Sequence, residues 1–392
     1  ISECLVGSEM CIRDRYYIGK DYSLGGITLL CRFDGQRVTM ASQMSEADET
    51  VSSLYSVKSE QATMLSFDTY NYLVHYFGQP QGSMSDDPNG TLGGDYEFII
   101  SSASAERIEL KGKKYGNRIV MKALTEDQTW KQYLTKIKKV EDDAFFYEYD
   151  LLMDGLYTGQ MIRSNYTFIV TYYDEIGKVH QKTVPFMFTA DGLRFHEPVT
   201  IDGQTMQNFV WKNELISFVC TDEGATGVKL AGVYTAGYQS YDYYPGTYQM
   251  DFYRLNDETG QLEVASQEVR LLKNEDGKSY WLKGLEYDIL VMYDKPRGGL
   301  SVSPQLLEKV QGGYVYLAMW DVMNDYVLRN KSIGLISYAT TNGIYLVDNG
   351  VWMGEVSGFI FGVYNSQEED AAFIGYTDAV ASIRLVKKTI EE

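Results

Sequence analysis

Hydrophobic and polar residues alternate with a period of two along most of this chain. The alternation is clearest in Asp95–Met121, where Ile108 and Leu110 alternate with Glu109 and Lys111. Successive side chains of a β-strand point to opposite faces, so this period predicts antiparallel strands with one buried face. The same texture recurs in most other segments, and the chain is therefore expected to be mainly β.

Turn signals support this fold class. Asp-Gly and Asn-Gly dipeptides tolerate the positive φ angles of tight hairpins. Six of them lie between apolar runs: Asp34-Gly35, Asp191-Gly192, Asp202-Gly203, Asp276-Gly277, Asn342-Gly343 and Asn349-Gly350. Short strands joined by such turns are typical of barrels and sandwiches. We expect two tandem antiparallel domains, each a calycin-like β-barrel or a β-sandwich.

One segment has a helical pattern. Trp130, Leu134 and Ile137 recur at helical spacing, and Thr125 precedes them as a candidate N-cap. This pattern predicts one helix near residues 125–142, within the first of the two domains.

The domain organisation is inferred from a break in the strand pattern. Glu223–Gly227 (EGATG) is short and glycine-containing, and it is the best candidate for a linker. It separates an N-terminal β domain, residues 16–222, from a C-terminal β domain, residues 228–392. Gln79–Gly94, which is rich in Pro, Gly, Ser and Asp, is predicted to be a loop.

The charge balance excludes one class of partner. Asp and Glu total 54 against 35 Lys and Arg, which gives a formal net charge of −19. Such a surface repels nucleic acid, because phosphate binding depends on cationic side chains. The sequence also has no apolar run of about 18 residues, the length that suggests a membrane-spanning helix.

Residue patterns for catalysis or metal binding are absent from the sequence. His75, His180 and His196 are far apart, and HExxH, paired CxxC, GxSxG and phosphate-binding glycine motifs do not occur. Cys31 and Cys220 each lie in an apolar run and are interpreted as buried thiols. We expect no metal, no cofactor and no enzymatic activity.

Carboxylates leave one enzymatic alternative open. Two Asp or Glu residues that face each other can serve as the acid and base of a glycosidase. Asp142, Asp143, Glu148 and Asp150 cluster after the predicted helix. A charged linker at the helix terminus is the simpler interpretation of that cluster.

Tyrosine is unusually abundant, with 33 Tyr against 16 Phe. Its apolar ring and polar tip suit half-buried strands as well as binding surfaces. Tyr238–Tyr248 (YQSYDYYPGTY) concentrates tyrosines around a Pro-Gly turn and is the candidate ligand-binding segment. Its candidate residues are Tyr238, Tyr241, Tyr243, Tyr244 and Tyr248. The alternative is a strand–turn–strand whose tyrosines pack on the sheet; Trp281 and Trp352 are weaker candidates.

The first fifteen residues differ from the rest. Ile1–Arg15 (ISECLVGSEMCIRDR) shows neither strand nor helix periodicity. The segment closely resembles the translated read-through of a sequencing-library adapter, and we interpret it as an artefact. On this interpretation Cys4 and Cys11 are foreign, and the native start, with any export signal, is missing.

Three segments together resemble a known family: MLSFDTYNYLVHYF (64–77), GDYEFIISSASAERIELKGKKYGN (94–117) and FMFTADGLRFHEPV (186–199). They are similar to large surface lipoproteins encoded in Bacteroidota nutrient-uptake loci, beside starch-utilisation-type outer-membrane transporters. The resemblance extends over about Tyr16–Glu392. It implies export, a lipid-modified cysteine and attachment to the outer membrane at the cell surface, although the lipid anchor is missing from this chain. It carries over no catalytic or binding residue.

The residues and this resemblance lead to one main expectation about function. We expect a non-enzymatic surface lipoprotein that captures a glycan or peptide nutrient for a complex with an outer-membrane transporter. Membrane contact is expected only through the lipid anchor. A structural or adhesive surface protein and a carboxylate-based hydrolase stay open as alternatives. A concavity lined by aromatic side chains would favour capture, whereas a flat surface would favour adhesion.

Overall fold

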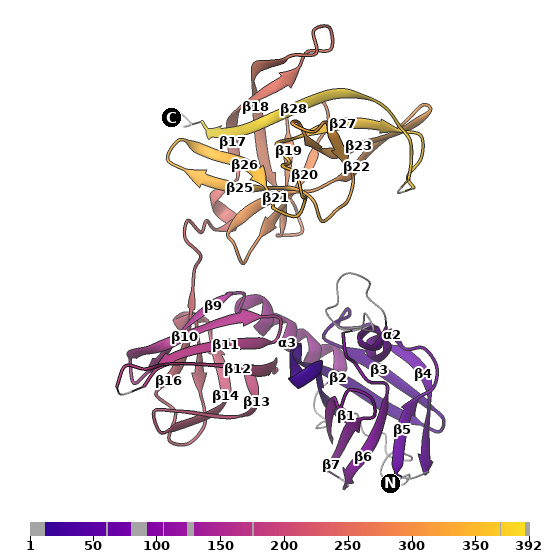
Figure 1. The fold of residues 1–392 in the computed structure, drawn as a ribbon, viewed down its shortest axis with the longest axis vertical. Helices are drawn as coiled ribbons and strands as arrows, with labels where there is room; N and C mark the ends of the chain where they lie inside the picture. Colours follow the sequence, from indigo (N-terminus) through magenta and orange to yellow (C-terminus); the bar gives the residue numbers. More distant parts are fainter. Residues whose placement is uncertain are drawn as a thin grey trace. The chain divides into compact units, whose positions relative to one another are not determined.

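The structure is a computed structural model that describes residues 12–59, 62–79, 92–104, 106–123, 129–174, 176–368 and 370–388. The chain divides into two compact units, unit 1 (Ile1–Val233) and unit 2 (Tyr234–Glu392). Antiparallel strands make up most of both units (Figure 1). The expected mainly β fold, with closed antiparallel barrels in tandem and one short helical region, is confirmed.

Unit 1 begins with a closed barrel. Its strands are β1 (Ile12–Ile18), β2 (Gly25–Asp34), β3 (Arg37–Ser42), β4 (Val51–Ser59), β5 (Thr63–Phe67), β6 (Glu97–Ala103), β7 (Arg107–Gly112) and β8 (Arg118–Ala123). Pairing of β1 with both β2 and β8 closes the barrel. Short helical turns, η1 (Lys20–Tyr22), α2 (Tyr72–His75) and η2 (Tyr76–Gly78), connect some of the strands.

Part of the segment interpreted as an artefact lies in this barrel. Ile12–Arg15 form the first half of β1, and their backbone pairs with β2 and β8. Residues 1–11 lie outside the described residues, as do residues 80–91 of the predicted loop. The ladder of this barrel therefore closes through residues that lack a strand-like sequence pattern.

A second closed barrel completes unit 1. Its strands are β9 (Glu148–Met153), β10 (Leu156–Ser164), β11 (Thr167–Tyr173), β12 (Val179–Phe188), β13 (Gly192–Ile201), β14 (Gln204–Lys212), β15 (Ser217–Cys220) and β16 (Val228–Val233), with a short turn η4 (Asn213–Leu215). β16 pairs with β15 and with β9. The predicted linker Glu223–Gly227 is consequently the loop before the strand that closes this barrel.

The predicted helix is present but begins later than expected. α3 spans Trp130–Asp143, and its N-cap is Thr129 rather than Thr125, which lies outside the described residues. The Thr129 hydroxyl accepts a hydrogen bond from the backbone N–H of Gln132 (3.2 Å), and the Gln132 side chain accepts one from the N–H of Thr129 (3.1 Å). This reciprocal pair satisfies two N–H groups at the helix start and sets where the helix begins.

The two barrels of unit 1 pack against each other through α3 and β2. Buried side chains of α3 share one hydrophobic cluster with the interior of the second barrel and with Leu30 and Ala41 of the first. Gly25, at the start of β2, has a φ of +71°, and a Cβ at this position would overlap the carbonyl oxygen of Tyr166. Only glycine allows this backbone conformation and this close approach together.

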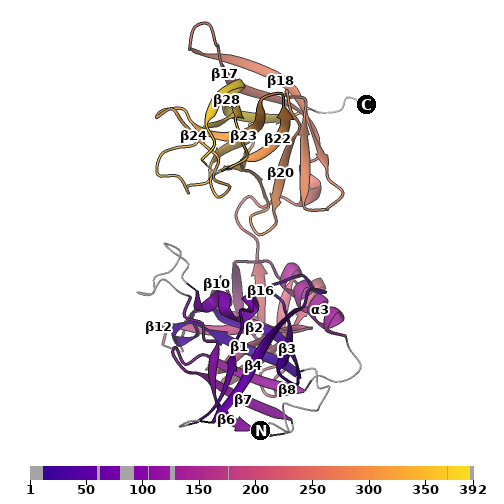
Figure 2. The same cartoon turned by 90° about the vertical axis from the view of Figure 1, so that its right-hand side faces the viewer.

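Unit 2 contains a larger closed sheet. Its ring of strands is β17 (Gly246–Leu255), β18 (Leu262–Lys273), β19 (Ser279–Lys283), β20 (Ile289–Asp294), β21 (Gly299–Val302), β25 (Leu335–Thr340), β26 (Gly343–Asp348) and β28 (Phe373–Lys387). The pairing of β28 with β17 closes the ring, and these two strands and β18 lie side by side in Figures 1 and 2. A branch extends from β28: β27 (Gly358–Tyr364), β23 (Gly313–Asp321), β22 (Gln305–Val310) and β24 (Tyr326–Leu328).

β28 belongs to both the ring and the branch because it changes partner along its length. Val380 and Ala381 pair with β27, whereas Arg384 and Leu385 pair with β26. Between them Ser382 has a φ of +53°, and the register against β17 shifts. Such a bulge bends the strand and lets it join two sheets.

A side chain connects the branch to β20. The amide oxygen of Gln305 accepts a hydrogen bond from the backbone N–H of Leu290 (2.8 Å), and its nitrogen donates to the carbonyl of the same residue (2.9 Å). The Gln305 amide thus takes the place of a strand neighbour for Leu290 and positions β22 beside β20.

A buried carboxylate holds the connection between β7 and β8. Asp95, which is 3% exposed, accepts hydrogen bonds from the backbone N–H groups of Lys114 (2.8 Å), Tyr115 (3.0 Å) and Asn117 (3.1 Å). The hydroxyl of Tyr16 on β1 donates to the carbonyl of Asp95 (2.8 Å). A buried charge is tolerated when it is hydrogen-bonded in this way, so Asp95 ties β6, the β7–β8 turn and β1 together.

Replacement of Asp95 should destabilise unit 1. We expect Asp95→Ala to lower the free energy of unfolding by about 3 kcal/mol, because three backbone N–H groups lose their acceptor. Asp95→Asn retains one acceptor oxygen and should cost less. Urea unfolding followed by circular dichroism measures both effects. Asp48→Ala, at a side chain that is 65% exposed, serves as the control and should have no measurable effect; equal stability of Asp95→Ala and the unaltered protein would contradict the assignment.

Candidate functional site

The predicted tyrosine segment covers the end of the unit 2 ring where β17 and β19 begin and β20 ends. It includes a short helical turn, η5 (Tyr241–Tyr243), directly before β17. The rings of Tyr241 and Tyr280 stack with centroids 4.7 Å apart, and Tyr293 packs edge-on against Tyr241 at 5.5 Å. The segment is therefore part of an aromatic cluster with β19 and β20.

The hydroxyl groups of this cluster bind the backbone. Tyr244 donates to the carbonyl of Gly298 (2.8 Å), and Tyr248 donates to the carbonyl of Tyr244 (2.6 Å). Tyr280 donates to the carbonyl of Tyr241 (2.7 Å). Each phenol buries its ring and satisfies a carbonyl of the connecting segment, which is how tyrosine is accommodated in a core.

The five candidate tyrosines thus differ in what they present to solvent. Tyr244 and Tyr248 are 1% and 0% exposed, so their rings offer no surface to a ligand. Tyr238 and Tyr241 are half-buried, and Tyr243 is 40% exposed with the Lys387 ammonium 5.3 Å from its ring centroid. The structure gives the segment a packing role and leaves Tyr243 as its exposed ring.

The three histidines have separate surroundings. His75 Nδ1 lies 3.0 Å from the carbonyl oxygen of Asn71, and its ring stacks on Tyr96. His180 Nε2 lies 2.8 Å from a carboxylate oxygen of Asp174. In the described ranges, no three His, Cys, Asp or Glu side chains group closely enough to hold a metal ion.

The other candidate groups have structural positions. Asp142 and Asp143 belong to the end of α3, and Glu148 and Asp150 lie on β9, so the predicted charged linker is the end of a helix and the start of a strand. Burial, together with the nearby Glu148 carboxylate, raises the pKa of Asp150. Cys31 and Cys220 are buried in the cores of the two unit 1 barrels and do not form a disulfide.

An open pocket of about 540 Å³ lies in unit 2, against the outward-facing side of β19. Along β19, Tyr280 and Leu282 point into the core, and the alternate residues Trp281 and Lys283 face the pocket. Leu307 reaches the pocket from β22, where the register against β23 shifts between its two neighbours. A bulge of this kind redirects a side chain that would otherwise follow the strict alternation.

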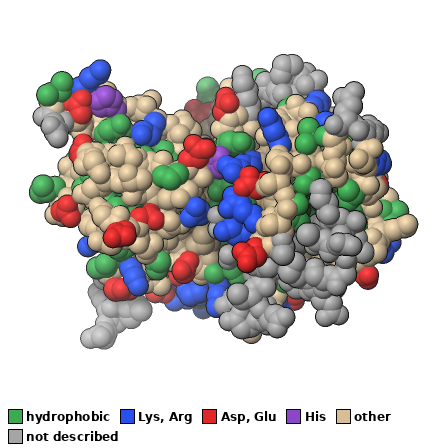
Figure 3. Space-filling view, turned by 90° about the horizontal axis from the view of Figure 1, so that it is seen from below, with side chains coloured by type: hydrophobic (Ala, Val, Ile, Leu, Met, Phe, Trp, Pro, Cys, Tyr) green, Lys and Arg blue, Asp and Glu red, His purple; other side chains and the backbone are tan. Residues whose placement is uncertain are grey.

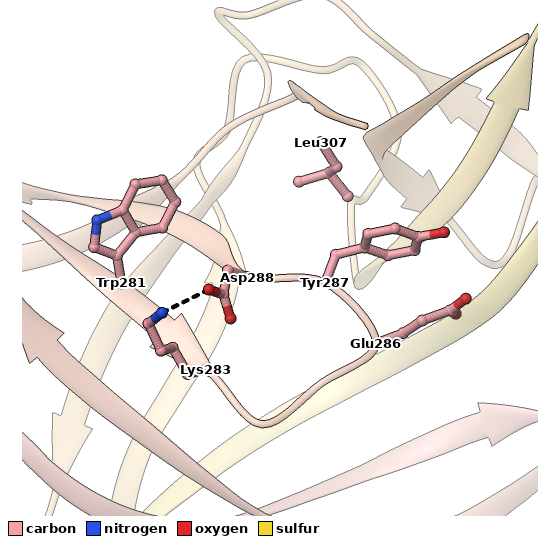
Figure 4. Close-up of a pocket in the computed structure, with 6 residues that line it drawn as sticks. All are labelled: Trp281, Lys283, Glu286, Tyr287, Asp288 and Leu307. Carbon is pink, nitrogen blue, oxygen red and sulfur yellow. Dashed lines mark hydrogen bonds and ion pairs between the residues drawn. The ribbon is translucent and has the colours of Figure 1, made fainter. Parts of the chain in front are cut away.

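The β19–β20 turn supplies the remaining lining residues, Glu286, Tyr287 and Asp288. Figure 4 shows Trp281 on one side of the pocket and Tyr287 with Leu307 on the other. The Lys283 ammonium and the Asp288 carboxylate form an ion pair at 2.7 Å between them. The ring of Tyr287 is held edge-on against Phe361, with centroids 5.3 Å apart.

The pocket is aromatic and mildly acidic. One lysine and two carboxylates line it, so a carboxylate remains in excess after the Lys283–Asp288 pair. Burial raises the pKa of Tyr287, and the carboxylates Glu286 and Glu308 raise it further. The arrangement offers two aromatic faces with hydrogen-bonding groups between them.

Sequence reasoning found only one residue of this pocket. Trp281 was a weaker candidate, and it is half-buried with one side open to the pocket. Leu307 could not be found, because its strand was not predicted and its orientation depends on the bulge. Trp352, the other weaker candidate, donates from its indole N–H to Asp321 (3.0 Å) and packs against Tyr326.

A family model described as "Domain of unknown function (DUF4302)" matches residues 2–213, more than half of the chain. The chain belongs to the DUF4302 family. A second model, also described as a domain of unknown function (DUF4987), matches residues 221–361 of this DUF4302 protein. The match of the first model includes both barrels of unit 1 as far as β14, and that of the second includes the pocket of unit 2.

The other comparisons give no information beyond the family assignment. A solved structure described as intact Ap-TbpB, with N and C lobes, is 12% identical to the chain; the match covers 93% of this chain and 67% of that one, with a TM-score of 0.16. A score this low carries nothing about function. No curated protein matches the DUF4302 chain. No helix in the described part of the chain is long and apolar enough to span a membrane.

The tyrosine cluster should control alkaline stability. Burial raises the pKa values of Tyr248, Tyr280 and Tyr293 well above the usual value of about 10. Their stabilising contribution is therefore complete below about pH 10 and is lost as the pH rises further, because the unfolded chain ionises first. Tyrosinate absorbance and circular dichroism, recorded together against pH, should show these phenols ionising only as β structure is lost.

A substitution within the cluster tests whether these tyrosines cause the loss of stability at high pH. Tyr280→Phe removes the donor to the Tyr241 carbonyl and should cost about 1 kcal/mol at neutral pH, whereas Tyr243→Phe should be neutral. Ionisation of all tyrosines near pH 10 with unchanged circular dichroism would contradict the prediction.

Proposed function

We propose that this protein is a non-enzymatic capture protein that binds a nutrient glycan in the pocket of unit 2. The observation that supports this proposal most directly is the open, aromatic-walled pocket between Trp281 and Tyr287. Capture requires such a concavity, whereas an adhesive protein needs only an extended surface.

The pocket chemistry favours a glycan over a peptide. Sugar rings present apolar C–H faces that stack on aromatic rings and hydroxyl groups that bind carboxylates and amines. Trp281 and Tyr287 offer the faces, and Glu286, Asp288 and Lys283 offer the polar groups. Because a carboxylate is in excess, a neutral saccharide suits the pocket better than an acidic one.

The proposed cellular location follows from the sequence resemblance. The protein would be a Bacteroidota surface lipoprotein, attached to the outer membrane by a lipid and associated with an outer-membrane transporter. The family models describe domains of unknown function and do not bear on this role. A structural or adhesive role and a carboxylate-based hydrolase are the outcomes that the test must separate from capture.

A glycan-binding screen of the purified chain, followed by isothermal titration calorimetry, tests the proposal. We expect a neutral oligosaccharide to bind and to be recovered unchanged. Trp281→Ala should weaken binding by about 2 kcal/mol, or roughly thirtyfold in Kd, the scale of a central aromatic contact.

Tyr338→Ala provides the matched control, since Tyr338 is a 64% exposed aromatic residue of β25 that does not line the pocket. This variant should bind like the unaltered protein. No binding to any glycan, or equal binding by Trp281→Ala, would overturn the assignment. Release of shortened products would identify a hydrolase instead.

A further inference from the structure

A second pocket, of about 340 Å³, lies between the two barrels of unit 1. The first barrel contributes Arg107 from β7 and Arg118 and Lys122 from β8. The second barrel contributes Arg194 from β13. Figure 3, which shows the underside of the molecule as drawn in Figure 1, has Lys and Arg side chains gathered near the middle of the face. The concentration of positive charge is notable in a chain whose net charge is −19.

The cationic side chains of the first barrel lie on the outer face of two neighbouring strands, β7 and β8. On β8, Ile119 and Met121 are buried in the barrel, and the alternate residues Arg118 and Lys122 point outward. Lys122 is directly opposite Arg107 in the β7–β8 ladder. Like charges in directly opposed positions of an antiparallel pair are destabilising.

Nearby carboxylates neutralise only part of this charge. Glu109 lies between the cations and contacts Arg107 at 2.6 Å and Arg118 at 3.6 Å. Glu197 is the acidic residue among the described residues that line the pocket. In this part of the chain, four cationic side chains therefore lie beside two carboxylates.

The wall from the second barrel is formed by a wide bulge. Arg194 pairs with Asn208, but the next register pair is Val199 with Met206, so several residues of β13 oppose Gln207 alone. The Gln207 amide donates to the carbonyls of Phe195 and His196 in place of ladder hydrogen bonds (3.2 and 3.3 Å).

This bulge turns a histidine toward the first barrel. The His196 side chain is 8% exposed, and its ring lies between Tyr17 and Tyr22, with centroids 4.2 and 4.4 Å away. Its Nδ1 is buried and has no hydrogen-bond partner among the described residues. Burial and, to a smaller extent, Arg118 lower the pKa of His196, so the ring is neutral at pH 7. His196 therefore lines the pocket without adding positive charge.

The partner of Arg194 among the described residues is an amide. Its guanidinium donates to the side-chain oxygen of Asn208, and the Asn208 amide donates to Asp222 (2.6 Å). A guanidinium anchored by a neutral amide keeps donors for another acceptor, since it has five N–H groups in a fixed fork.

We propose that the pocket between the barrels of unit 1 binds a small ligand through an oxyanion group, a carboxylate, sulfate or phosphate. Arginine forks match these planar or tetrahedral anions, and a bound oxyanion would lie among side chains of opposite charge. The proposal concerns a different site from the neutral-glycan pocket of unit 2 and does not depend on it.

Calorimetric titrations of the full chain at low ionic strength test the proposal. The probes are sodium sulfate, inorganic phosphate and sodium galacturonate, with galactose as the neutral counterpart of galacturonate. We expect at least one anion to bind with one site per chain, galactose to give no signal at this site, and added NaCl to weaken the anion. The anion that binds most tightly identifies the type of oxyanion group.

The double variant R118Q/K122Q locates the site. It should weaken anion binding by at least about tenfold while keeping the melting temperature, because it also removes opposed like charges. The matched control K131Q/K139Q removes two positive charges from α3, where the side chains are 65% and 67% exposed, and should bind normally. Trp281→Ala should also bind anions normally.

Three results would overturn the proposal. One is the absence of binding by all three anions. Another is equal anion affinity in R118Q/K122Q and the unaltered chain, which would place the anion elsewhere. The third is an equal loss in K131Q/K139Q, which would show that overall charge, and not the pocket, attracts the anion.

Discussion

Closure of the hydrogen-bond ladder is the constraint on which the rest of this structure depends. The pairings of β1 with β8, β9 with β16 and β17 with β28 close the two barrels of unit 1 and the ring of unit 2, and so remove the edges that these would otherwise expose. A closed barrel of this size fills its interior with alternate side chains, so binding groups must come from outward positions, turns and bulges. Both pockets obey this rule: Trp281 and Lys283 face outward from β19, as Arg118 and Lys122 do from β8.

The same constraint explains the abundance of tyrosine. A phenylalanine at position 280 would fill the same volume, but the carbonyl of Tyr241 would lose its donor. The tyrosine hydroxyl donates to a carbonyl of the irregular segment that precedes β17. This hydrogen bond attaches the segment to the end of the ring, because a buried carbonyl needs a partner. A cluster of tyrosines in a sequence can thus be part of the core, with each hydroxyl bound to a backbone carbonyl. The sequence does not show which carbonyls lie close enough for such bonds.

The sequence predicts the local features of this fold much better than its long-range ones. Asp-Gly and Asn-Gly turns and two-residue alternation predict hairpins such as β2–β3, because both signals act over a few residues. The start of α3 was misplaced since Thr125 and Thr129 are both acceptable caps, and the Gln132 partner decides between them. β9 and β16 were missed: β9 carries outward acids that read as a linker, and β16 is recognisable only as the partner that β9 requires. Neither pocket was predicted, because residues as distant as Arg118 and Arg194 meet only through barrel packing.

Both pockets contain local features that do not serve the stability of the fold. The fold alone does not require several cations at one edge of the first barrel, nor a bulge in β13 that leaves His196 Nδ1 without a hydrogen-bond partner among the described residues. Consistent local choices are the general rule in stable proteins, and departures from it concentrate at functional sites. In the pocket of unit 2 the departure is milder, a bulge that turns Leu307 toward Trp281. The opposite charge of the two linings would let the two proposed sites discriminate between ligands: an acidic group repelled by Glu286 would be attracted by the cations of unit 1.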